Sequence, residues 1–254
     1  MTELLGRWAK SLGGPRSSPE GGSAERRTDV GQHMRVPLRR YKQAQITAKL
    51  TRMWKDEHDH FLLENMIRAL DARYDLIGKA AKERGVTEII TQMIGRLANY
   101  FGTLSDIQEK VILDIACGSN TSRAPASLFI DTPFGEIRLG RSTRRYTAQF
   151  EPWFCRILFE LRAKPVGVDF GDLEHELFPH HRVDLGQKGA LDFLPSRSFD
   201  AIQDSRLFGS PEFTAQFPNQ ADRLKVAQEI RRQEQRLLRS DGIIIHSDAA
   251  ALLK

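Results

Sequence analysis

Residues 111–120 read Val-Ile-Leu-Asp-Ile-Ala-Cys-Gly-Ser-Asn, an apolar run that carries an acid and ends in small residues. Asp114 is the acid, and Ala116, Gly118 and Ser119 supply the small side chains. A tight turn of small residues lets backbone N–H groups approach a bound nucleotide closely. We therefore expect the first strand and the ligand loop of a nucleotide-binding α/β domain here.

Further polar residues stand at the ends of later apolar segments. Asp169 and Phe170 end the run Val-Gly-Val-Asp-Phe, and Asp184 and Leu185 end the next one. An acid in the position of Asp169 can accept hydrogen bonds from both hydroxyls of a ribose. Gln203 ends a fourth segment, and we include it among the candidate ligand-binding residues.

This series resembles the motifs of class I S-adenosylmethionine-dependent methyltransferases. Asp114, Ala116 and Gly118 are similar to that family's first motif, an acid followed by alternating glycines, although only Gly118 is a glycine here. Residues 194–200, Leu-Pro-Ser-Arg-Ser-Phe-Asp, resemble its run into the fourth strand, and ordered matches extend over residues 111–247. The resemblance implies S-adenosylmethionine as cofactor.

By the same resemblance, Asp169 would bind the ribose, Asp184 the adenine amino group, and Leu185 would pack on the adenine ring. The turn is feasible without its usual glycines, because Asn120 tolerates a left-handed conformation and Ala116 is small. The implied activity is methyl transfer to a small-molecule acceptor. RNA methylation and a catalytically silent cofactor-binding or interaction module are the alternatives.

Two other interpretations of the acids remain open. A dinucleotide-binding dehydrogenase predicts a third glycine and an acid about 20 residues after the motif. Asp169 instead lies 55 residues after Asp114, which argues against that class. In the other interpretation, Asp114 and Asp169 only cap the ends of their strands.

The long interval comes from a predicted insertion at about residues 121–147. Residues 128–140 alternate apolar and polar side chains around turn-forming residues, which indicates a hairpin. Because the insertion follows the ligand loop, we expect it beside the cofactor cleft, where Arg141, Arg144 and Arg145 could receive an anionic acceptor. A solvated basic loop is the alternative.

No catalytic residue is identifiable from the sequence. Methyl transfer mainly requires alignment of the reactants and exclusion of water. Asp204 could orient a donor group and His246 could act as a base, but an exposed Asp and a core His are the commoner roles. We expect no metal site, because His58 and His60 point to different sides of a charged helix start.

The elements expected around these residues define an α/β fold. Apolar residues recur at helical spacing over residues 41–101, with a break at Gly85 and a cap at Thr87. Strands at 110–116, 165–169, 181–185, 199–203 and 242–247 alternate with helices at 149–163 and 220–238. This alternation predicts a Rossmann-like parallel sheet of order 3-2-1-4-5, without the family's closing sixth and seventh strands.

Three regions follow: a flexible basic tail (1–40), a helical segment that packs on the core (41–108) and a methyltransferase-like domain (109–254). The net charge of +5 lies in residues 1–60, which carry 12 Lys and Arg against 7 Asp and Glu, so nucleic-acid contact would involve this part. Two cysteines, no membrane-length apolar run and no secretory signal favour a cytoplasmic protein. The oligomeric state is not predicted.

Overall fold

The computed structural model describes residues 30–54, 56–119, 129–132, 135–138, 148–171, 173, 176–204, 207–208 and 210–254. The chain divides into two units, Met1–Val36 and Pro37–Lys254. Of the first unit, only residues 30–36, the start of helix α1 (Val30–Thr51), are described.

The sheet of the second unit has five parallel strands. They are β1 (Val111–Ile115), β4 (Lys164–Asp169), β5 (His180–Arg182), β6 (Phe199–Asp204) and β7 (Leu238–Ser247), arranged β5-β4-β1-β6-β7. Numbered along the sheet's own strands, this is the predicted order 3-2-1-4-5. The predicted α/β fold is therefore confirmed, and β5 and β7 form the edges of the sheet as described.

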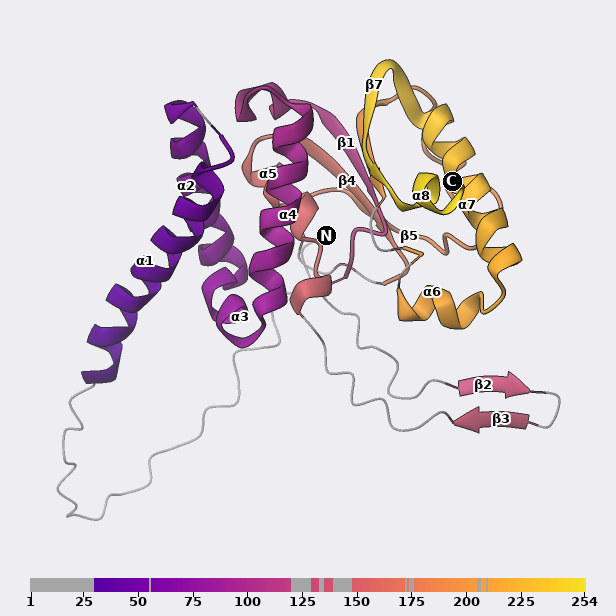
Figure 1. The fold of residues 1–254 in the computed structure, drawn as a ribbon, viewed down its shortest axis with the longest axis horizontal. Helices are drawn as coiled ribbons and strands as arrows, with labels where there is room; N and C mark the ends of the chain where they lie inside the picture. Colours follow the sequence, from indigo (N-terminus) through magenta and orange to yellow (C-terminus); the bar gives the residue numbers. More distant parts are fainter. Residues whose placement is uncertain are drawn as a thin grey trace, which may run out of the picture. The chain divides into compact units, whose positions relative to one another are not determined.

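Side chains alternate between the two faces of β1, and each face has its own hydrophobic core. Ile112 packs with helices α2 (Glu57–Tyr74), α4 (Arg84–Tyr100) and α5 (Trp153–Glu160). Leu113 and Ile115 instead pack against α7 (Gln220–Leu237) and α8 (Asp248–Leu252) on the opposite face. Figure 1 shows the helices in these two layers. Helices on both faces bury a parallel sheet completely.

The helices that precede the sheet begin and end at other residues than the periodicity predicts. The apolar stripe predicted one helix to Gly85, but α2 ends at Tyr74 and α3 (Leu76–Lys82) follows Asp75, which has a left-handed φ of 54°. Gly85 and Thr87 both lie inside α4, whose N-cap is Glu83. Apolar spacing alone did not reveal these breaks, because the stripe continues across Asp75 to the buried Leu76 and Ile77.

Helix α1 (Val30–Thr51) begins earlier than residue 41. Leu38 and Tyr41, whose side chains lie in the described part of this helix, are both exposed and so add no buried residue to a periodic apolar signal. Residues 1–29 of the predicted basic tail lie outside the described residues. Among the described helices, none combines the length and the hydropathy that crossing a bilayer requires.

The predicted hairpin in the insertion is present as two short strands. β2 (Phe129–Thr132) and β3 (Gly135–Arg138) pair antiparallel, as the predicted hairpin requires. Arg141, Arg144 and Arg145 of the same insertion lie outside the described residues. Three short helices, η1 (Leu104–Ile107), η2 (Ala148–Phe150) and α6 (Pro211–Gln216), complete the described elements.

The last strand is longer than residues 242–247. β7 begins at Leu238, directly after α7, and Leu238 pairs with Phe199 before a shift in register. The polar residues 239–241 hide this first part of the strand from a search for apolar runs.

Candidate functional site

The turn after β1 has left-handed backbone at two of its residues, whereas Asn120, where the sequence suggested it, lies outside the described residues. Ala116 adopts a left-handed φ of 59° and Gly118 a φ of 97°. Left-handed backbone costs a residue with a Cβ roughly 1 kcal/mol, and glycine nothing. Ala116 therefore occupies a position that favours glycine, and a non-glycine residue held in this region is typical of functional loops.

Gly118 and Asp169, which lie far apart in the sequence, meet directly at this turn. The Gly118 amide donates to Asp169 Oδ2 at 3.0 Å, and the Gly171 amide donates to Oδ1 at 2.9 Å. The backbone of Cys117 also donates to Val168 O of β4 at 3.1 Å. These contacts orient the Asp169 carboxylate toward the turn.

The segment at the end of η2 closes over the same turn. The Ser119 amide donates to the carbonyl oxygen of Phe150 at 3.0 Å. A Cβ placed on Gly118 would lie only 2.1 Å from that oxygen, so no side chain fits at this position. Gly118 is therefore required both by its φ and by the close approach of Phe150.

Asp114 lies beneath the turn, away from solvent. Its Oδ1 accepts a 3.4 Å hydrogen bond from the side-chain amide of Gln203, and the thiol of Cys155 lies 3.7 Å from Oδ2. Burial raises the pKa of Asp114 to about 8, although the hydrogen bonds from Gln203 and Cys155 act against this shift. Burial likewise raises the pKa of the Cys155 thiol, which keeps its proton.

The other candidate residues lie along β4 and β5. Phe170 is 63% exposed, and the Arg182 guanidinium lies 5.7 Å from its ring centroid. Asp184 accepts hydrogen bonds from the Gly186 amide and the Gln187 side chain, at 3.0 and 3.2 Å. Leu185 is buried in the core on the α7 face. The structure thus brings Gly118 to Asp169 and Asp114 to Gln203.

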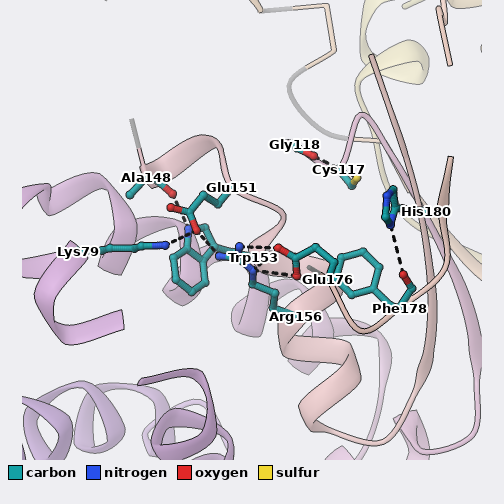
Figure 2. A network of polar contacts seen from close by, with 10 residues as sticks. All are labelled: Lys79, Cys117, Gly118, Ala148, Glu151, Trp153, Arg156, Glu176, Phe178 and His180. Atoms are coloured by element: carbon teal, nitrogen blue, oxygen red, sulfur yellow. Dashed lines mark hydrogen bonds and ion pairs between the residues drawn. The ribbon is translucent and has the colours of Figure 1, made fainter. Parts of the chain in front are cut away.

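A buried ion network lies beside the turn (Figure 2). Arg156 of α5 contacts the carboxylate of Glu151 and pairs with Glu176 at 2.6 Å, and all three side chains are at most 2% exposed. Lys79 of α3 reaches the same Glu151 carboxylate at 2.6 Å. Glu176 and Glu151 raise the pKa of Arg156 against the opposing effect of burial, so it stays charged.

Asp204 and His246, which were considered separately for catalytic roles on sequence grounds, lie together at the ends of β6 and β7. Asp204 Oδ2 accepts hydrogen bonds from the Ser247 hydroxyl at 3.0 Å and the Ala249 amide at 3.3 Å, and Oδ1 accepts from the Asp248 amide. His246 Nδ1 lies 3.1 Å from the carbonyl oxygen of Asp204. Ligand-type atoms of Asp204, His246 and Asp248 lie within 4.8 Å of one another. The hydrogen bonds assign Asp204 to the start of α8, and a catalytic role stays a prediction.

Cavities open near the sheet among the described residues. One of about 560 Å³ adjoins β5 and is lined by Asp184 together with His180, His181, Arg182, Val183, Gln187, Ala190 and Phe193. Another, of about 330 Å³, lies near the amino-terminal ends of β1 and β6, where Lys110 and Asp200 contribute to its wall. Ligands of open α/β sheets bind outside the carboxyl ends of the strands, which favours the β5 side.

Sequence reasoning did not identify Phe150, Glu151, Arg156 or Glu176. The sequence indicates in part that Glu151 and Arg156 are buried in pairs, because these charges flank or interrupt the apolar helix around Trp153. A charge within an apolar stripe is buried with a partner more often than alone. The identity of that partner depends on the fold.

The parallel sheet, the helices on both of its faces and the tight turn after its central strand define a Rossmann-like α/β fold. Comparison of the sequence with protein-family models gave no match, and searches of curated proteins and of solved structures gave none either. The fold class therefore rests on the structure itself.

Proposed function

We propose that this chain is an S-adenosylmethionine-dependent methyltransferase that acts on a small-molecule acceptor. The contact between the Gly118 amide and the Asp169 carboxylate carries this proposal. It joins the glycine of the first motif to the acid that would bind a ribose, although 51 positions separate them in the sequence. Since β1 and β4 pair in parallel, their carboxyl ends meet at the edge of the sheet where a nucleotide-type cofactor would bind.

The residues at the turn fit such a cofactor in their chemistry. Asp169 would accept hydrogen bonds from the ribose hydroxyls, and Asp184 would accept one from the adenine amino group. Ala116 and Gly118, at the end of the central strand, have the left-handed backbone that favours glycine and that is typical of a turn approached closely by a ligand. When bound, S-adenosylmethionine supplies an electrophilic methyl group, and the chain aligns the acceptor and excludes water.

The charge distribution favours a small acceptor over a polyanion. Residues 61–254 carry 26 basic and 26 acidic side chains, whereas the excess positive charge lies in residues 1–60. From the order of the strands and helices, we propose residues 109–254 as the catalytic domain and residues 41–108 as a helical segment packed on it. Nucleic-acid binding to purified chain at physiological salt would favour the RNA alternative.

Titration calorimetry with S-adenosylmethionine tests the proposal. The wild type should bind, and Asp169→Asn should weaken binding about tenfold or more, because a charged acceptor is lost from hydrogen bonds of roughly 1.5–3 kcal/mol. Asp222→Asn, an exposed acid on α7, is the matched control and should bind like the wild type. A parallel titration with NADH tests the dinucleotide-binding class.

Absence of binding to the folded wild type would remove the proposal, as would undiminished binding by Asp169→Asn. Tighter binding of NADH than of S-adenosylmethionine would favour the dinucleotide-binding class instead.

A further inference from the structure

We infer that the buried ion network of Lys79, Glu151, Arg156 and Glu176 holds the turn after β1 (residues 116–119, here called the cofactor turn) in place. Glu151 is the positioning residue. This inference rests on the proposed function for its ligand. Its structural part concerns the turn alone and does not depend on which ligand binds there.

The network acts through the short segment from Ala148 to Glu151. The indole N–H of Trp153 donates to Ala148 O at 2.6 Å and fixes one end of the segment. The Glu151 carboxylate, held by Arg156 and Lys79, fixes the other end. Gln149 and Phe150 lie between these anchors, and the carbonyl oxygen of Phe150 accepts a hydrogen bond from the Ser119 amide at 3.0 Å.

The tolerance for movement of this segment is small. Because a Cβ on Gly118 would stand 2.1 Å from Phe150 O, the segment and the turn are already in close backbone contact. Gly118 in turn donates to Asp169, so a shift at Phe150 reaches the ribose-binding carboxylate through two contacts. Figure 2 shows Lys79 and Arg156 directed at Glu151, with Gly118 in the same view.

The four charges come from separate parts of the chain. Lys79 lies on α3, Arg156 on α5, and Glu176 between β4 and β5. The negative charges of Glu151 and Glu176 balance the positive charges of Lys79 and Arg156. The Arg156 guanidinium also lies 4.7 Å from the centroid of the Trp153 ring. A balanced, fully paired cluster fixes one geometry, because any displaced member leaves a buried charge without its partner. The helical segment before the sheet is thereby coupled to the cofactor turn.

Lys79 provides the cleanest test, because its side chain is 26% exposed and its removal leaves both Arg156 ion pairs in place. In Lys79→Met, the Ser119 amide of the ligand-free protein should exchange with deuterium about threefold faster or more. The dissociation constant for S-adenosylhomocysteine should rise about threefold to tenfold. Lys79→Arg restores the charge and should restore both values.

Lys164→Met is the control, because it removes an exposed ion pair with Glu109 at the start of β4, the opposite end of that strand from Asp169. It should change neither readout. The inference would be overturned if the Ser119 amide of folded Lys79→Met exchanged at the wild-type rate. It would also be overturned if exchange became faster while the dissociation constant for S-adenosylhomocysteine stayed unchanged. If exchange accelerates but the wild type binds no S-adenosylhomocysteine, the positioning of the turn stands and the proposed function fails.

Discussion

Replacing Arg156 with Met should lower the free energy of unfolding by about 3–5 kcal/mol, the range measured when one partner of a buried ion pair is removed. Arg156 is 2% exposed and neutralises Glu151 and Glu176, which are buried as well. Its guanidinium also lies 4.0 Å from the centroid of the Tyr74 ring. Met has no charge and would lose this cation–π contact. Urea unfolding followed by circular dichroism measures the change.

Two further variants separate the loss of charge from the loss of packing. Arg156→Met combined with Glu176→Gln should be less destabilised than the sum of the single variants, because one orphaned carboxylate is removed. Arg68→Met breaks an exposed ion pair with Glu64 and should cost less than about 1 kcal/mol. If Arg156→Met costs no more than Arg68→Met, the network does not hold the protein as described.

Replacing Asp114 with Asn should stabilise the protein at pH 8 and change the dependence of its stability on pH. Burial raises the pKa of Asp114 to about 8 from an ordinary value of 3.8. Asn has the same shape and no proton to lose, and its amide can serve the contacts to Gln203 and Cys155. Each pKa unit corresponds to about 1.4 kcal/mol, so the advantage at pH 8 should amount to several kcal/mol.

The sign follows from the two states. Between pH 4 and pH 8 the folded chain keeps the Asp114 proton and the unfolded chain releases it, so this group's contribution to stability decreases as pH rises. Below pH 4 the contribution is fully present, and above pH 8 it is lost. Urea unfolding at pH 5, 6.5 and 8 should therefore show a difference between the Asp114→Asn variant and the wild type that grows with pH. A constant difference would contradict the burial of an unionised Asp114.

The sheet could be predicted from the sequence because β1, β4 and β6 contain short apolar runs bounded by polar or small residues. The edge strands β5 (His-His-Arg) and β7, with its polar first part, gave a weaker signal. The helical segment was less well predicted at its breaks. Asp75 ends α2 in a left-handed conformation and pairs with Arg39, and the buried Asp71 also binds Arg39, at 2.6 Å through Nε. An acid at a break and an acid inside a helix look alike in the sequence, and both acids here pair with an arginine of α1 that is more than 30 residues away.

The candidate site was predicted through residues that directly follow strands. Gly118 and Asp169 could be placed because the turn and the strand end both have local patterns. The roles of Phe150 and Glu151 could not, since they depend on how η2 packs over the turn. The burial of Asp114 follows from its contacts with Gln203 and Cys155, which belong to β6 and α5.

A crystal structure of the chain with S-adenosylhomocysteine tests the central claim most directly. We expect the ribose hydroxyls within hydrogen-bond distance of the Asp169 carboxylate, and the ligand beside the turn of Ala116 and Gly118. A ligand bound only in the cavity near Lys110 and Asp200, or no bound ligand at saturating concentration, would contradict the proposed cofactor site.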